Sequence, residues 1–350
     1  MQESEVILES WSPCCDVQAF VEKSESCYYF YLWFYPGTEN GYIKSCWIAN
    51  TCPAPEEFDN ETMADGMAPA MPQKSISHDV NGIQLNPESL RVEWFEEGDA
   101  AALMDEDDIL CVIPGWGGIK NFSGYAKYAV GMTPFAWELT EAKKTLRQRI
   151  NKSHEFWDST NGDYWAKIQK MHLTVLEDFF GTYEKYYAID DGDFPPKALI
   201  TGSKGNVCYG ITAGVSLLSM PLVEQYFQDE VPDFRRIELG FAATEKWQDI
   251  CPKMYSFLSG VSRLPWNDIT FLGHGHTIPC NAIEGYSAIW LLNARLIAEL
   301  SSPVYPEFKG DKINLLWAVP VKQNLYEAIK ENGTDEILKQ MDLTDIHIFN

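Results

Sequence analysis

The chain has 350 residues, of which 45% are hydrophobic and 13% aromatic, a composition that excludes a disordered polypeptide and predicts about two folded domains. Its 27 lysines and arginines against 51 aspartates and glutamates give a net charge of −24. Such an acidic balance argues against binding to nucleic-acid phosphates and favours basic partners. The nine cysteines include no Cys-x-x-Cys pair, which predicts reduced thiols and neither a disulfide framework nor a thiolate zinc site.

The sequence shows no apolar run near the ~20 residues that a membrane-spanning helix needs. Its first residues lack both the basic start and the apolar core of a secretion signal. We therefore expect a cytoplasmic protein with no membrane contact.

Residues 1–137 are predicted to form a β-rich domain, whose role the sequence does not reveal. The aromatic run 27–35 and the run 42–48 flank a Pro-Gly-Thr-Glu-Asn-Gly turn, which is typical of a β-hairpin. Further strands are expected at 90–95 and 109–113. The second of these leads into a glycine-rich loop whose Trp116 either covers the core or contacts a ligand.

Residues 138–350 are predicted to form an α/β domain that opens with a helical connector. A narrow apolar stripe predicts a helix near 140–150, and a broader stripe predicts a second helix at 164–180, with His172 as a core residue. Apolar runs predict strands at 198–201, 207–212, 236–240 and 313–319. Three more helices are expected at 247–258, 323–332 and 334–341, the last one capped by Thr334.

The stretch 265–279, Pro-Trp-Asn-Asp-Ile-Thr-Phe-Leu-Gly-His-Gly-His-Thr-Ile-Pro, holds the candidate binding residues. Residues 269–272 are predicted to form a short buried strand that ends in a glycine turn. In an extended chain, His274 and His276 would project from one face. We take these two histidines as binding candidates with Trp266, Asp268 and Thr277, and with Trp116 from the first domain. In the alternative interpretation, His276 and Thr277 only satisfy backbone groups at a tight corner.

Four motifs in order resemble the suppressor-of-fused domain: Ile-Thr-Ala-Gly-Val-Ser-Leu-Leu-Ser-Met-Pro at 211–221, Glu-Leu-Gly at 238–240, the block at 265–279, and Leu-Trp-Ala-Val-Pro at 316–320 before a helix. The resemblance spans roughly 160–350, although residues 181–212 depart from the family pattern. It implies an α/β sandwich with a mixed sheet, and hence an α+β fold for the whole chain. It also implies binding of other proteins without catalysis, as in animal proteins that sequester a transcription factor and in bacterial immunity proteins.

The charge and the resemblance favour an immunity or antitoxin protein that neutralises a cognate, possibly basic, toxin domain without catalysis, cofactor or metal. One alternative is a metal-dependent hydrolase that uses His274 and His276, with Asp268 or His172 as a third ligand. Another alternative is an adaptor that sequesters an endogenous regulatory protein. The identity of the partner separates the adaptor from the immunity protein.

Overall fold

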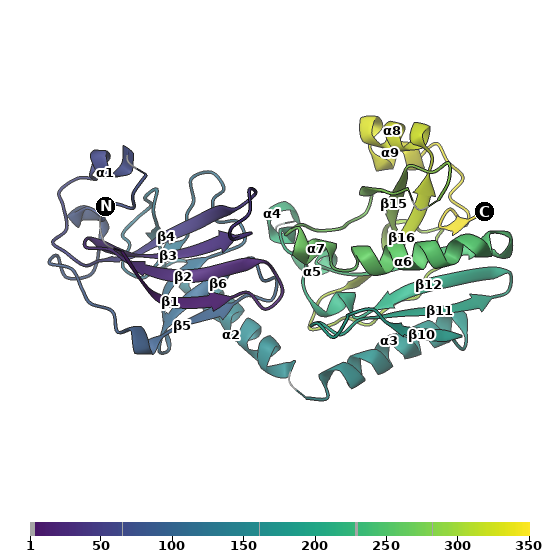
Figure 1. The fold of residues 1–350 in the computed structure, drawn as a ribbon, viewed down its shortest axis with the longest axis horizontal. Helices are drawn as coiled ribbons and strands as arrows, with labels where there is room; N and C mark the ends of the chain where they lie inside the picture. The colour runs from purple at the N-terminus through teal and green to yellow at the C-terminus, as the bar shows by residue number, and fades with distance from the viewer. Residues whose placement is uncertain (1–3, 65, 161, 228–229, 282) are drawn as a thin grey trace. The chain divides into compact units, whose positions relative to one another are not determined.

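The computed structural model describes residues 4–64, 66–160, 162–227, 230–281 and 283–350. The chain divides into two compact units, Met1–Ser159 and Thr160–Asn350 (Figure 1). Strands dominate the first unit, whereas the second combines helices with a mixed sheet, so the predicted α+β class is confirmed.

The strands that the structure describes in the N-terminal unit form two β-sheets. An antiparallel four-stranded sheet runs in chain order, with β1 (Glu5–Trp11), β2 (Val17–Lys23), β3 (Cys27–Phe34) and β4 (Tyr42–Asn50). A five-stranded sheet follows, with β5 (Leu90–Trp94), β6 (Ala101–Asp105), β7 (Asp108–Ile113), β8 (Tyr125–Ala126) and β9 (Trp137–Glu138). The predicted hairpin is confirmed as the pair β3–β4, and the strands expected at 90–95 and 109–113 are β5 and β7.

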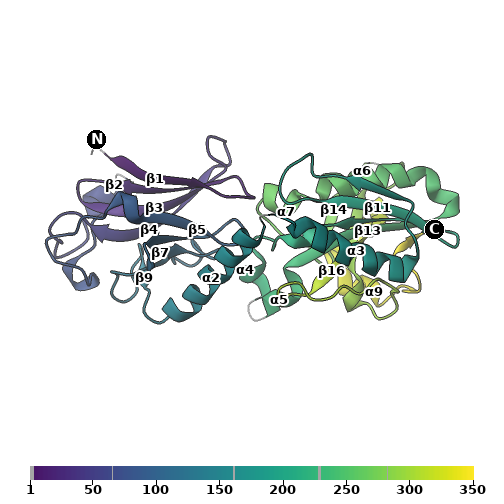
Figure 2. The same ribbon diagram turned by 90° about the horizontal axis from the view of Figure 1, so that it is seen from below.

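The helices of this unit are α1 (Asn60–Ala64) and α2 (Lys143–Ser159). Figure 2 shows α2 beside the sheet that contains β5 and β7. Leu146 and Ile150 of α2 are buried in one apolar cluster with Phe95 and Val112. The first unit therefore extends through α2, past the boundary expected at 137/138, because the apolar stripe of this helix completes the first core.

The C-terminal unit is built on one sheet with the strand order β10-β11-β12-β13-β16-β15-β14, to which β17 adds at β13. Among the strand pairs of the described residues in this sheet, only β13–β16 and β13–β17 are parallel, so the sheet is mixed. Its strands are β10 (Lys185–Ala188), β11 (Ala198–Lys204), β12 (Val207–Ala213), β13 (Arg236–Thr244), β14 (Thr277–Pro279), β15 (Ala288–Asn293), β16 (Ile313–Val321) and β17 (Ile348–Phe349). These bounds confirm the four strands predicted in this half.

Helices cover both faces of the sheet. They are α3 (Tyr164–Phe180), α4 (Val223–Phe227), α5 (Val231–Phe234), α6 (Cys251–Val261), α7 (Leu264–Asn267), α8 (Gln323–Asn332) and α9 (Thr334–Leu338). Figure 1 shows α3 and α6 on opposite sides of β10–β12. Alternation along β12 explains this arrangement, since Tyr209 and Ile211 join the core cluster of α3, whereas Gly210 lies against the ring of Tyr255 in α6.

One predicted element is wrong, because residues 269–272 form no strand. Ile269 has a φ of 43°, which breaks the extended conformation directly after α7. The backbone N–H of Thr270 donates to the carbonyl of Pro265 at 2.8 Å, and that of Leu272 lies 3.4 Å from the sulfur of Met220. Ile269 and Leu272 are nevertheless buried, so the apolar run marks an irregular segment that enters the core.

The predicted cap at Thr334 is also wrong. The residue before the first turn of α9 is Gly333, and Thr334 is the first helical residue. Its hydroxyl accepts a hydrogen bond from Trp290 Nε1 at 3.0 Å and donates to the carbonyl oxygen of Gly275 at 3.3 Å. Thr334 therefore connects α9 to β15 and to the glycine turn, instead of serving the end of its own helix.

Candidate functional site

The candidate site is an apolar pocket of about 300 Å³ in the C-terminal unit. It is lined by side chains from α4, α5, β13, β15 and β16, together with residues 271–274 and 276 from the candidate stretch. Segments separated by up to about ninety residues in the chain therefore meet in one concave surface, which is the usual setting for a ligand or a partner side chain.

Four aromatic side chains form one wall of the pocket. Phe227 and Phe234 are stacked with ring centroids 4.4 Å apart, and Phe271 lies edge-on to Phe227 at 5.7 Å. Tyr226 adds a tilted contact to Phe271 at 5.2 Å and is 65% exposed, so it stands at the rim. Because aromatic rings in such contacts hold one another in place, the wall is largely preformed.

The floor of the pocket is the sheet. Ile237 in β13 and Leu316 in β16 are buried side chains from the parallel pair at its centre, and Leu272 is buried beside them. Leu296 also lines the pocket and is 53% exposed, so it lies at the rim. The pocket thus offers apolar surface from its base to its opening.

The backbone around His274 turns sharply. Gly275 has a φ of +85°, and a methyl group at its Cα would lie 2.6 Å from the Thr334 hydroxyl oxygen, so this position requires glycine. Hydrogen bonds between Gly275 N and Leu291 O, and between Leu291 N and His276 O, both at 2.8 Å, attach the turn to β15. The chain is therefore not extended here, but both histidines still line the same pocket.

The two imidazoles already have partners within the protein. His274 Nδ1 accepts a hydrogen bond from the backbone N–H of Asn293 at 3.1 Å, and its Nε2 lies 4.0 Å from a carboxylate oxygen of Asp335. The pKa of His276 is lowered by burial, which a hydrogen bond with the Phe271 backbone opposes. Burial also lowers the pKa of His274, despite the attraction of Asp335. Both rings are therefore neutral at pH 7.

Two buried asparagines complete the polar part of the lining. Asn293 Nδ2 donates to Asn314 Oδ1 at 2.9 Å, and Asn293 Oδ1 accepts from the backbone N–H of Arg295 at 3.0 Å. Asn314 Nδ2 in turn donates to the carbonyl oxygens of Asp233 at 2.8 Å and Arg236 at 3.1 Å. The polar atoms at the base are thus occupied by the protein itself, and the accessible surface is mostly carbon.

The six binding candidates that were proposed from the sequence lie in different places in the structure. His274 and His276 line the pocket, whereas the other three from the same stretch do not belong to its lining. Trp266 is buried and donates from Nε1 to the Ser219 carbonyl at 3.0 Å, which is a structural role. Asp268 is exposed at the end of α7, and Thr277 pairs with Trp290 in the sheet.

Trp116 belongs to the N-terminal unit. It is half-buried, and the Arg149 guanidinium lies 5.8 Å from its ring centroid. Arg149 is also paired with the buried Glu97 at 3.2 Å, so this contact joins α2 to the loop regions of the first core.

Sequence reasoning missed the aromatic wall. Tyr226, Phe227, Phe234 and Phe271 lie in short helices and an irregular segment, which have no regular apolar spacing. The one available signal was local composition, since three aromatic residues occur between 226 and 234 before a buried strand.

Residues 199–350 match the family model of the Suppressor of fused protein (SUFU). The match begins in β11 and contains the whole pocket, including the glycine turn. It covers less of the chain than the resemblance at 160–350 suggested, because α3 and β10 lie outside it. A SUFU domain implies a role in protein–protein interaction.

No curated protein and no solved structure matches the chain. Among the residues that the structure describes, no helix combines the length and the apolar character that a membrane span requires.

Proposed function

We propose that the chain is a non-catalytic, protein-binding protein whose apolar pocket accepts a hydrophobic side chain of its partner. This proposal rests on one observation: polar groups that line the pocket are hydrogen-bonded to other groups of the protein itself. His274 Nδ1 and the side-chain amides of Asn293 and Asn314 are hydrogen-bonded within the protein, and most of the remaining surface is aromatic and aliphatic. Such a surface gains free energy from covering apolar area, which is how buried anchors at protein interfaces contribute.

A partner with a basic surface suits this chain. The net charge of −24 attracts positively charged proteins over a distance and speeds their association at low ionic strength. An apolar anchor would then supply the short-range affinity. We propose, more specifically, that the partner is a toxin with a basic functional surface and that binding neutralises it, as an immunity protein does. An adaptor that sequesters an endogenous regulator would use the same pocket and charge.

Metal-dependent hydrolysis receives no support from the geometry. Within the described ranges, no group of three or more histidine, cysteine, aspartate or glutamate side chains is placed to hold a metal ion. His172, one suggested third ligand, is fully buried and lies 3.3 Å from the Ser216 hydroxyl, away from the pocket lining. Asp268, the other, is exposed.

The pocket can be blocked without strain through Gly273. A methyl group at its Cα would lie 3.5 Å from the Phe271 ring and 3.9 Å from His276 Nε2, which are ordinary contacts, and its φ is not in the left-handed region. We expect Gly273→Leu to fill part of the cavity. Gly260 in α6 faces open space, so Gly260→Leu is a matched control outside the pocket.

The test is co-purification from the native cell with the wild-type chain and both variants as bait, followed by identification and titration of the captured protein. Losing one buried apolar anchor costs about 1.5–3 kcal/mol, so Gly273→Leu should weaken binding by roughly ten- to a hundredfold. Gly260→Leu should bind like the wild type. Equal binding by all three proteins would remove the pocket from the interface.

The nature of the captured partner decides between the finer proposals. A secreted or toxin-like protein, particularly one from a neighbouring gene, supports immunity, whereas an endogenous regulator supports the adaptor. Turnover of a small compound that is abolished by replacing His274 and His276 would overturn the non-catalytic proposal.

A further inference from the structure

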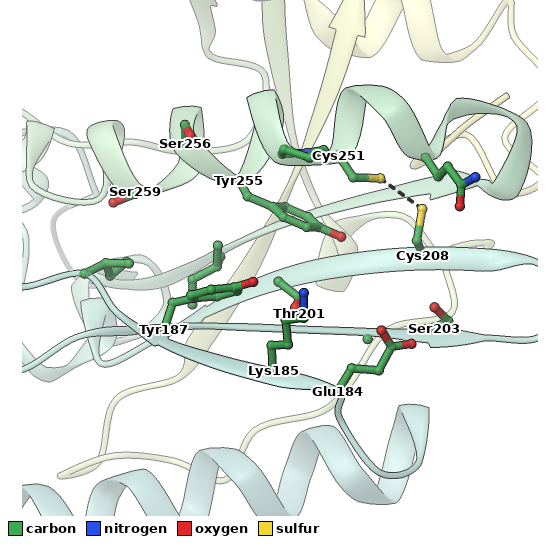
Figure 3. Close-up of a pocket in the computed structure, with 15 residues that line it drawn as sticks. Glu184, Lys185, Tyr187, Thr201, Ser203, Cys208, Cys251, Tyr255, Ser256 and Ser259 are labelled. Carbon is green, nitrogen blue, oxygen red and sulfur yellow. Dashed lines mark hydrogen bonds between the residues drawn. The ribbon is translucent and has the colours of Figure 1, made fainter.

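A second cavity, of about 670 Å³, lies between α6 and the face formed by β10, β11 and β12. Figure 3 shows Tyr255 of α6 on one side and Tyr187 of β10 on the other, with Thr201 and Ser203 of β11 along the sheet. Two cysteines stand at one end of this cavity, Cys208 from β12 and Cys251 from the first turn of α6.

The two sulfur atoms are 2.9 Å apart. Cys208 is half-buried, and its thiol also lies 3.3 Å from the carbonyl oxygen of Ala243, to which it can donate. Cys251 is 4% exposed and has a longer contact, 3.9 Å, with the Trp247 carbonyl. A disulfide bond of about 2.05 Å would require the sulfurs to approach by less than about 1 Å.

Their surroundings hold the two cysteines in this position. Tyr255, one turn after Cys251 in α6, donates from its hydroxyl to the Tyr209 carbonyl of β12 at 2.8 Å. Its ring packs directly on Gly210, where a Cβ atom would come within 2.3 Å of it. The glycine thus lets α6 lie close to the same strand that carries Cys208.

Two other pairs of neighbouring thiols differ from this one in access or geometry. Cys46 and Cys111 contact each other, but both are completely buried, so a reagent does not reach them in the folded state. Cys14 and Cys15 are adjacent in sequence, with Cα atoms about 3.8 Å apart. This separation is below the range of about 4.4–6.8 Å that is usual for disulfides. The pair in the cavity combines proximity with an open approach.

We propose that Cys208 and Cys251 form a redox-modification site, which a low-molecular-weight disulfide such as glutathione disulfide oxidises to an intramolecular disulfide. This inference is independent of partner binding at the apolar pocket. It also agrees with reduced thiols as the resting state, since disulfides in reducing compartments are mostly transient and redox-sensing.

The reaction proceeds by two thiol–disulfide exchanges. The Cys208 thiolate attacks one sulfur of glutathione disulfide, forms a mixed disulfide and releases one glutathione thiolate. The Cys251 sulfur then loses its proton, attacks the Cys208 sulfur and releases the second glutathione thiolate. The two protons from the cysteines end on the two glutathione molecules, so the protein loses two electrons and glutathione disulfide gains them.

The roles of the two cysteines follow from their environments. Burial and the neighbouring Cys208 raise the pKa of Cys251 to about 12, which keeps it a thiol at neutral pH. The more accessible Cys208 is therefore the attacking residue and Cys251 the resolving one. The cross-link would tie the start of α6 to β12 and fix the width of the cavity at this end.

The test is a peptide map of the full-length protein after incubation with glutathione disulfide and alkylation of the remaining thiols. In the wild type we expect a cross-linked peptide pair containing Cys208 and Cys251, which dithiothreitol releases. In Cys251→Ser we expect glutathione to accumulate on Cys208, because no thiol resolves the mixed disulfide. In Cys208→Ser the cross-link should be absent and Cys251 unmodified, whereas the control Cys52→Ser should retain the cross-link.

The wild-type map alone decides the proposal if a variant fails to fold. Stable glutathione on Cys208 of the wild type without a cross-link would overturn it. Unmodified Cys208 and Cys251, or a cross-link of either one to another cysteine, would overturn it as well.

Discussion

The two glycines of the Leu-Gly-His-Gly-His turn should differ in their tolerance of a single added methyl group. Gly275 has a φ of +85°, and its new Cβ would lie 2.6 Å from Thr334 Oγ1 and 3.0 Å from Thr334 Cβ. Thr334 is held by its hydrogen bonds to Trp290 and to the Gly275 carbonyl. At Gly273, by contrast, a methyl group meets nothing closer than 3.5 Å.

The left-handed backbone costs an alanine about 1–2 kcal/mol, and the overpacking costs about 1–3 kcal/mol more. Alanine also lowers the conformational entropy of the unfolded chain, which stabilises the folded state by about 0.4–1 kcal/mol. Gly275→Ala should therefore lower the free energy of unfolding of the C-terminal unit by about 1–5 kcal/mol, whereas Gly273→Ala should stay within about 0.5 kcal/mol of the wild type.

Urea titration followed by tryptophan fluorescence measures the overall loss, and amide hydrogen exchange in residues 271–279 and β15 localises it. Hydrogen exchange is needed because two units need not unfold in one transition. The reasoning fails if Gly275→Ala is as stable as Gly273→Ala, or if protection is lost only outside these segments.

Three further predictions concern packing and protons. A Cβ atom at Gly210 of β12 would approach the Tyr255 ring of α6 to 2.3 Å, so Gly210→Ala should destabilise the C-terminal unit by about 1–3 kcal/mol. Gly260 of α6 faces open space, so Gly260→Ala should stabilise the unit by about 0.5–1 kcal/mol. Urea titration measures both effects. Burial lowers the pKa of His172 to about 3 in the folded state. Below about pH 6.5 the unfolded chain therefore binds a proton at His172 that the folded chain does not bind. The stability that the neutral, buried His172 contributes is thus fully present above that pH and is lost as the pH falls toward 3. His172→Leu should remove this slope, which the difference between wild-type and variant urea midpoints across pH reveals; an identical pH dependence would contradict it. Binding of a partner at the apolar pocket should weaken once the pH falls below the lowered pKa values of His274 and His276, because a protonated imidazole resists desolvation. Titration calorimetry at successively lower pH measures this, down to the pH at which the chain begins to unfold. An affinity that stays constant after NMR shows both imidazoles protonated would exclude contact with these rings.

The elements that sequence reasoning located well are those with a strong local signal. The aromatic run that forms β3 and the turn before β4 specify a hairpin through residues adjacent in the chain. The helix α3 was bounded by its apolar stripe and ends at Gly181, which has a φ of +87°. In both cases local preference and tertiary packing favour the same structure.

The predictions were wrong where contacts with distant parts of the chain determine the local conformation. The apolar residues of 269–272 have the composition of a strand, yet Ile269 has a positive φ and the segment packs irregularly after α7. Thr334 has the composition of a cap, yet its hydroxyl serves Trp290 and the glycine turn. Neither partner could be identified from sequence, because each lies about forty or more residues away in the chain.

The candidate site was likewise predicted only in part from the sequence. The histidine pair was visible as a motif, but the chain is not extended there, so alternation does not explain why both residues line one pocket. The turn at Gly275 and its hydrogen bonds to β15 place both rings on the pocket instead. The aromatic wall depends on three separate segments, so no single stretch of sequence predicts it.

The arrangement of the pocket bears on how tightly it could bind. The pocket is already ordered by the stacked rings of Phe227 and Phe234 and by the hydrogen bonds of Asn293 and His274. Binding of a partner side chain would therefore cost little conformational entropy in the pocket. The exposed rim, by contrast, retains Tyr226 at 65% exposure and Leu296 at 53%, and a partner that covers these residues gains further apolar burial. Affinity would therefore come from a rigid interior and an adaptable rim, while the acidic surface governs the rate of encounter.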